Sequence, residues 1–202
     1  MIDLVATFIF FFAVIDPIGT VPVFIAVTNQ CDPRAKRMIA VRATIISAII
    51  LVFFVTAGEL ILTAIDIPLA AFQIAGGIVL FLFALTMIFG DSKPEQEVKL
   101  ATSASETAVF PLAVPSIASP GAMLAAVMQT ENTQFSLWEQ VQTTAVMLSV
   151  LLIVLALMLA AIWIHRWIGN SGASIISRVM GLILASVAVE SVLAGIKAYF
   201  GL

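Results

Sequence analysis

The chain has 202 residues, of which 62% are hydrophobic and only 10% charged, and its mean hydropathy is +1.17. Soluble domains are roughly half apolar and a quarter charged, so this composition excludes a single water-soluble core and a disordered chain. Nine Lys and Arg against twelve Asp and Glu leave no basic stripe for nucleic acid. One cysteine and one histidine exclude an internal disulfide and a protein-only zinc site. The composition predicts an integral membrane protein without a cofactor.

Six apolar segments are each long enough to cross a bilayer as a helix, which needs roughly 20 residues. Their unbroken apolar runs favour helices over the alternating strands of an outer-membrane barrel. We therefore predict an all-α membrane protein with six transmembrane helices. We expect the first to be retained rather than cleaved as a signal peptide. The predicted spans cover residues 4–28, 43–65, 67–90, 107–130, 140–164 and 179–202.

Lys and Arg residues are distributed unevenly over the predicted loops. Eight of the nine follow spans one, three and five, and only Lys197 lies toward the other side. Positive residues concentrate in cytoplasmic loops, so we expect these three loops in the cytoplasm and both termini outside. The eight residues are Arg34, Lys36, Arg37, Arg42, Lys93, Lys99, Arg166 and Arg178.

Two segments share a proline spacing that indicates an internal repeat. Residues 17–22 in span one and 115–120 in span four both read proline, four small or apolar residues, proline. Spans three and six also align, with Gly76 against Gly181, and the extra residues of the second half fit a longer loop around 130–140. Each half has three spans, an odd number, so the second must enter the membrane from the opposite side. The sequence predicts an inverted-topology repeat, a common plan in secondary transporters, divided into residues 1–90, a cytoplasmic linker at 91–106, and 107–202.

The proline pairs predict that spans one and four are interrupted near mid-membrane. Proline removes a helical hydrogen bond and its ring clashes with the preceding turn, although a simple kink is the alternative outcome. Backbone groups freed in a bilayer need protein, water or ligand, so both breaks should face the bundle interior. There the second half-helix of each span presents N–H groups and a positive dipole end, which suit a small carboxylate. The candidate substrate-binding residues are Asp16, Pro17, Ile18, Gly19, Thr20, Pro22, Pro115, Ser116, Ala118, Ser119, Pro120 and Gly121.

Two acidic residues lie deep in the predicted spans, where a charge costs about 2.5–3.5 kcal/mol on insertion scales. Asp16 binds a substrate ammonium group or carries a coupling proton, or it caps the half-helix that begins at Pro17, and one carboxylate can do both. Ser119 has the pattern of the corresponding cap in span four. Glu190 is either a second ion-coupling acid or a polar contact between helices. Glu59 is expected to reach the membrane interface.

Together these residues resemble the MarC family of bacterial inner-membrane proteins, part of the lysine-exporter-like superfamily, over nearly the whole chain. The resemblance implies the bacterial inner membrane. Some members look like transporters of small neutral amino acids, so it also implies a glycine- or alanine-like solute held at the paired breaks. Thr20, Ser119 and Glu190 stand where members often carry Asn, Gly and Gln. The motifs that carry the resemblance are residues 16–19 with Pro22, residues 74–77, residues 110–115, Pro120 with Gly121, and residues 176–181.

The leading prediction is a secondary transporter of small neutral amino acids, coupled to protons and working by alternating access. The alternatives are a passive channel or facilitator for another small solute, or a membrane assembly protein. For a homo-oligomer, the small-residue face of Gly121 and Ala125 offers contacts. An intramembrane enzyme is disfavoured, because Asp16 is the only intramembrane aspartate and no His-Glu-x-x-His pattern occurs.

Overall fold

The computed structural model describes residues 2–29, 31–89, 108–132 and 135–201, together with the backbone but not most side chains of residues 162–177. The predicted linker at 91–106, with Lys93 and Lys99, and the Arg166 side chain lie outside the described residues. Every regular element within that part of the chain is helical. The elements are α1 (Leu4–Ile15), α2 (Pro17–Val27), α3 (Pro33–Ala64), α4 (Leu69–Phe89), η1 (Ala108–Ile117), α6 (Pro120–Met128), α7 (Leu137–Leu159) and α8 (Ala161–Phe200).

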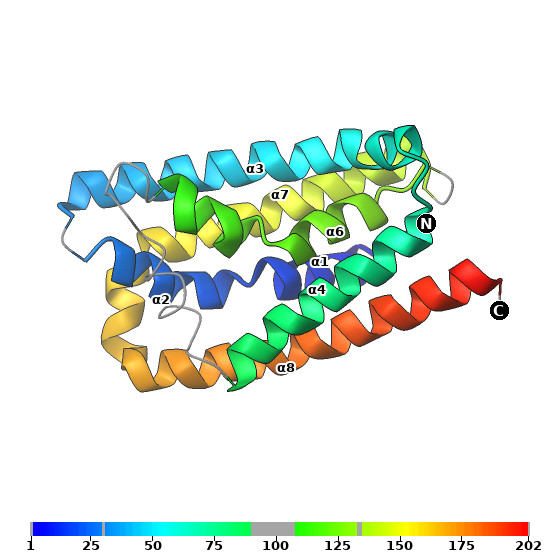
Figure 1. Ribbon diagram of the computed structural model, residues 1–202. Helices are drawn as coiled ribbons and strands as arrows, with labels where there is room; N and C mark the ends of the chain where they lie inside the picture. Colours follow the sequence, from blue (N-terminus) through cyan, green and yellow to red (C-terminus); the bar gives the residue numbers. More distant parts are fainter. Residues whose placement is uncertain (1, 30, 90–107, 133–134, 202) are drawn as a thin grey trace.

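The helices form a bundle of membrane-crossing segments. Five described segments are long and apolar enough to cross a bilayer, the first made of α1 and α2, and the bent pair of η1 and α6 makes a sixth. The segments run back and forth along one axis, so that both chain ends lie at the same end of the bundle (Figure 1). We call this the terminal end. The opposite end, where α3 begins with Arg34, Lys36 and Arg37, is the basic end. The predicted all-α, six-span fold is confirmed.

Two helices are longer than the apolar pattern predicts. α3 begins at Pro33 rather than at residue 43, because the Asp32 side chain accepts a hydrogen bond from the Ala35 N–H at 3.2 Å and caps the helix. α8 contains 40 residues, of which only Arg178–Phe200 has the composition of a span. The extension of α3 continues into charged sequence, which a search for apolar windows does not detect. α8 instead includes residues 161–164, which the prediction assigned to the fifth span but which follow the end of α7 at Leu159.

The two halves of the chain pack against each other reciprocally. α1 and α2 of the first half contact α7 of the second, whereas η1 and α6 of the second contact α3 of the first. In the same way, α2 contacts α8 and α6 contacts α4. These contacts exchange with one another when the halves are interchanged, as an inverted repeat requires. The two broken spans therefore lie between α3, α4, α7 and α8, although the exact limits of the halves stay a prediction.

Glycine allows α4 and α8 to lie very close together. A Cβ on Gly77 would lie 3.0 Å from the carbonyl oxygen of Ala188, and a Cβ on Gly195 would lie 3.0 Å from that of Ala70. Small residues permit such backbone contact, which drives helix association in membranes where burial of apolar surface does not. The third span of each half thus forms a tight pair that closes one side of the interior.

Candidate functional site

The first break lies at Asp16, between α1 and α2. The residue has a left-handed backbone with φ 52° and ψ 65°, and its Oδ1 accepts a hydrogen bond from the Gly19 N–H at 2.9 Å. This bond caps α2, which has Pro17 as its first residue, so the capping role predicted for Asp16 is confirmed. A Cβ on Gly19 would overlap the Asp16 carboxylate. α2 continues through Pro22, so the second proline does not interrupt the span, contrary to the prediction. The loss of one hydrogen bond can bend a helix without ending it.

The second break is longer and begins inside η1. Phe110 and Val114 have extended backbones there, and α6 is bent by 50° from the preceding helical segment. The Ser119 Oγ accepts a hydrogen bond from the Ala122 N–H at 3.1 Å and caps α6, which has Pro120 as its first residue. The cap predicted for Ser119 is confirmed.

The caps also correct the register between the halves. Asp16 precedes the first proline of its pair and Ser119 precedes the second of its own. In the structure Asp16 therefore corresponds to Ser119, whereas the proline spacing aligns it with Val114. The reason is that the second half unwinds several additional residues before its half-helix starts. Part of the extra length lies at the break itself rather than in the loop around 130–140.

Ser119 joins the two breaks directly. While its Oγ accepts from the Ala122 N–H, the same hydroxyl donates to the carbonyl oxygen of Val14 at 3.2 Å. Val14 lies in the last turn of α1, where carbonyl groups lack partners within the helix. One hydroxyl group therefore caps the start of α6 and the end of α1, and it links helices from opposite halves.

A second contact between the breaks involves Thr20 and Ser116. The Ser116 Oγ donates to the Thr20 Oγ1 at 3.5 Å, and the Thr20 hydroxyl donates to the Asp16 carbonyl oxygen at 3.0 Å. From α3, the Ser47 hydroxyl donates to the Ala43 carbonyl oxygen of its own helix at 2.9 Å and shares the same hydrogen with the Ala113 carbonyl oxygen at 3.3 Å. Sequence reasoning missed Ser47, although a serine in a long apolar run is the kind of signal that marks a polar contact between membrane helices.

We call Asp16, Thr20, Ser116 and Ser119 the polar junction. None of the four is more than 2% exposed. The structure thus brings the polar residues of both predicted breaks together, in a closed arrangement. Among the other candidate residues, Pro17, Gly19, Ala118 and Gly121 are buried, Ile18, Pro22 and Pro115 are half-buried, and Pro120 is exposed.

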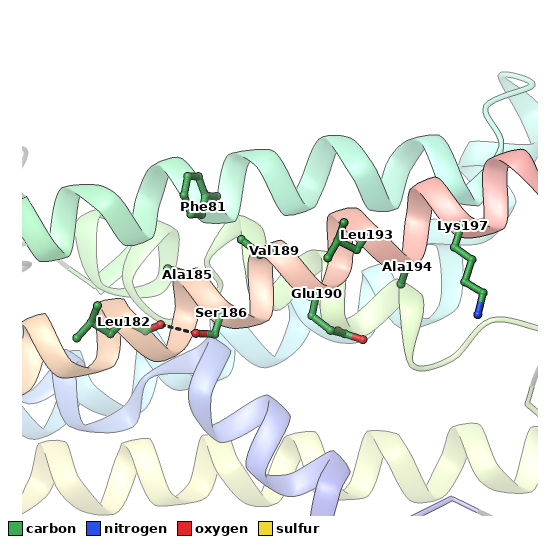
Figure 2. Close-up of a pocket in the computed structure, with 9 residues that line it drawn as sticks. All are labelled: Phe81, Leu182, Ala185, Ser186, Val189, Glu190, Leu193, Ala194 and Lys197. Carbon is green, nitrogen blue, oxygen red and sulfur yellow. Dashed lines mark hydrogen bonds between the residues drawn. The ribbon is translucent and has the colours of Figure 1, made fainter. Parts of the chain in front are cut away.

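Glu190 lies apart from the polar junction. It is exposed on α8 and lines two hollows, one of about 590 Å³ between α1, α4, α6 and α8, and one of about 830 Å³ along α8. Figure 2 shows that Glu190 and Lys197 project from the same side of α8. Within the described residues, no three or more His, Cys, Asp and Glu side chains are grouped as they would be around a metal ion.

Two other predicted residues have clear surroundings. The Glu59 Oε2 accepts a hydrogen bond from the exposed Asn132 N–H at 2.8 Å, which places this carboxylate at the terminal end, and its position at the membrane interface stays a prediction. Gly121 and Ala125 are buried within the chain, where a Cβ on Gly121 would lie 2.8 Å from the Val14 Cγ1. Helices of the same chain therefore pack against these two small residues, and the formation of a homo-oligomer stays a prediction.

The fold and the paired breaks define the class of protein: a multi-pass integral membrane protein with two interrupted spans at its centre. The sequence matches the profile described as MarC family integral membrane protein over residues 1–200, and the chain belongs to this family. It is 31% identical to a UPF0056 membrane protein of Buchnera aphidicola (subsp. Schizaphis graminum), over 99% of both chains. It is 34% identical to one of Methanocaldococcus jannaschii, over 92% of both chains. A third, from Aquifex aeolicus, is 30% identical over 96% of this chain and 92% of the relative. No solved structure matches.

Proposed function

We propose that the protein is a secondary transporter of small neutral amino acids, of the size of glycine or alanine, coupled to protons. The observation that carries the proposal is the hydrogen bond from the Ser119 hydroxyl to the Val14 carbonyl, which places the interrupted spans of both halves in contact. Paired broken helices at the interface of inverted repeats are the usual construction of solute sites in secondary transporters.

The chemistry of the polar junction fits both ends of a small amino acid. α2 and α6 each begin at a residue of the polar junction, and a helix N-terminus favours a carboxylate. The Asp16 carboxylate and the carbonyl groups at the end of α1 suit the ammonium group. The side chains of the junction are short, so a solute that replaces their mutual contacts has to be small. Because the junction is closed in this structure, binding requires the halves to move apart, which is the motion of alternating access.

The basic end is proposed to face the cytoplasm of a bacterium, with both termini outside the inner membrane. Arg34, Lys36 and Arg37 lie at that end, and positive residues are retained on the cytoplasmic side. In this orientation Glu190 is reached from outside, and Asp16 lies between the two faces. We therefore propose that Asp16 binds both the solute and the coupling proton, and that Glu190 binds the coupling proton only.

The test is counterflow of radiolabelled glycine, alanine and serine in proteoliposomes, with Asp16→Asn as the variant. Asparagine is as good a helix cap as aspartate, so the variant removes the charge and keeps the local structure. We expect at least a tenfold loss of exchange. The matched control is Asp66→Asn, because Asp66 is an exposed aspartate with a similar left-handed backbone, φ 58°, far from the junction. Exchange by the control should equal that of the unaltered protein.

Coupling is tested in the same vesicles with an imposed proton gradient. Glu190→Gln should retain counterflow, which needs no net proton movement, and lose accumulation driven by the gradient. Absence of exchange of any of the three amino acids by folded protein would contradict the proposed solute class. Exchange without any gradient-driven accumulation by the unaltered protein would favour a passive facilitator instead.

A further inference from the structure

The hollow of about 590 Å³ opens at the terminal end of the bundle, and we call it the terminal hollow. Its rim includes Asp3, the cap of α1, and Gln129, the residue that ends α6. Its lining reaches Gly121 in the first turn of α6. Because a helix rises about 1.5 Å per residue, the hollow extends along α6 for roughly 12 Å. Its lining residues therefore extend from the terminal end to the level of the second break.

A thin apolar layer separates the floor of the terminal hollow from the polar junction. Leu80 lines the hollow, is 2% exposed, and has its Cδ1 in the space that a Cβ on Gly121 would occupy. Val14 lies beside it, and its carbonyl oxygen accepts the hydrogen bond from Ser119. The side chains of Leu80 and Val14 thus lie closest to Gly121, on the side where Val14 accepts the hydrogen bond from the junction.

The terminal hollow has a charge preference. Asp3 and Glu190 are its ionisable lining residues, and both are acids. The charged group next to it is Lys197, which lines the adjoining hollow along α8 together with Glu190 (Figure 2). No basic side chain lies on the described lining of the terminal hollow itself, whose other polar members include Gln73 and Ser191. Such a lining favours neutral or amine-bearing solutes and opposes anions.

We propose that the terminal hollow is the entrance through which water and a small neutral or amine-bearing solute approach the polar junction, and that Leu80 is the residue that closes its floor. The identity of the solute rests on the proposed function. The entrance and its closure do not, because they can be measured with a thiol reagent alone. Movement of Leu80 away from Gly121 then opens the floor of the hollow toward the polar junction.

The experiment is cysteine labelling from outside in a Cys31→Ser background, with membrane-impermeant thiol reagents. Gln73→Cys lines the terminal hollow, and Ala75→Cys lies on the same helix at nearly the same depth but is exposed on the surface of the bundle. Thiols react as thiolates, which need water, so a cysteine facing lipid reacts slowly. We expect Gln73→Cys to react at least tenfold faster than Ala75→Cys. Equal rates would overturn the proposal that the terminal hollow is an entrance. This includes the case in which a second copy of the chain covers the hollow.

Closure by Leu80 is tested at a residue beyond the floor. Ala118→Cys is fully buried next to the junction and should stay unlabelled. Combined with Leu80→Ala it should become labelled, whereas Leu80→Met, which conserves volume, should leave it protected. Protection in the Leu80→Ala protein, or labelling of Ala118→Cys alone, would overturn the assignment. Circular dichroism and elution volume establish that each variant is folded.

The charge preference is read from the same Gln73→Cys protein. We compare the labelling rates of a cationic and an anionic reagent of equal size, each divided by its rate with a free thiol. The ratio of the cationic to the anionic rate should be severalfold greater than one. Glu190→Gln should reduce this ratio toward one, and an unchanged ratio would remove Glu190 from the entrance. A labelled entrance in a protein that exchanges no amino acid would contradict the proposed function and leave the entrance in place.

Discussion

The two broken spans interrupt a helix in different ways. In the first, a single residue with a left-handed backbone, Asp16, ends α1 and caps α2 with an ionisable group. In the second, the chain passes through two extended residues in η1 before a neutral hydroxyl, that of Ser119, caps α6. Both breaks have a proline directly after the cap, whereas the capping residue itself differs between them. In both breaks proline is the first residue of the half-helix, and the residue before it determines whether the break contains an ionisable group.

The largest structural effect is expected from a methyl group at the first break. Gly19→Ala would force the Asp16 carboxylate away and remove the bond that caps α2. Overpacking costs about 1–3 kcal/mol, and we expect a loss of stability at the upper end of this range. Gly121→Ala, at the second break, meets the ends of the Leu80 and Val14 side chains, which can shift, and should cost about 1 kcal/mol. Thermal unfolding in detergent compares the two, and equal losses would contradict the distinction.

Removal of the hydroxyl at the second break comes next. Ser119→Ala loses a cap on α6 and leaves the Val14 carbonyl without its bond, so we expect a loss of about 2 kcal/mol. Ser136→Ala is the matched control, because the exposed Ser136 hydroxyl accepts from the Glu139 N–H and donates to the Glu139 carboxylate, both within α7 and neither to another helix, and its loss should cost about 1 kcal/mol. Unfolding midpoints lowered to the same extent would show that the link between the halves adds nothing.

The contact between Ser116 and Thr20 should have a small effect. Thr20→Val and Thr28→Val each remove a hydroxyl that donates to the carbonyl oxygen four residues earlier, but only Thr20 also accepts from Ser116. At 3.5 Å that bond is at the limit of useful length. We expect the two variants to differ in stability by no more than about 0.5 kcal/mol. A larger difference in the free energy of unfolding would mean that Ser116 and Thr20 approach more closely than 3.5 Å.

The smallest expected effect on stability belongs to Asp16→Asn. Asparagine can accept the Gly19 N–H bond and tolerates a left-handed backbone. The free energy of unfolding should therefore stay within about 0.5 kcal/mol of that of the unaltered protein. The same variant is expected to lose exchange. A clear fall in stability would show that the negative charge of Asp16 helps to hold the fold and would weaken its use as a probe of transport.

Much of this architecture could be predicted from the sequence, because its signals are local. Apolar length gives the spans, and an aspartate or serine directly before proline gives the caps at Asp16 and Ser119. The odd number of spans per half gives the inverted repeat. Each of these inferences needs only neighbouring residues or a count.

The rest depends on contacts between distant residues. The proline spacing cannot tell which proline starts the half-helix, so it aligns Asp16 with Val114 rather than with Ser119. The link from Ser119 to Val14 joins residues 105 positions apart and has no pattern of its own. The small faces of Gly121 and Ala125 suit contact with any helix, and only the folded chain shows that Val14 and Leu80 provide it.

The shared hydroxyl of Ser119 has a consequence for how the protein is made. Ribosomes add about 5–20 residues per second, so the 105 residues that separate Val14 from Ser119 correspond to a delay of about 5–20 seconds. During that interval the first span enters the membrane with an acid at its centre and a carbonyl group that has no partner yet. Biogenesis therefore includes a period in which the insertion machinery, lipid headgroups or penetrating water must stabilise the first span until the fourth is synthesised.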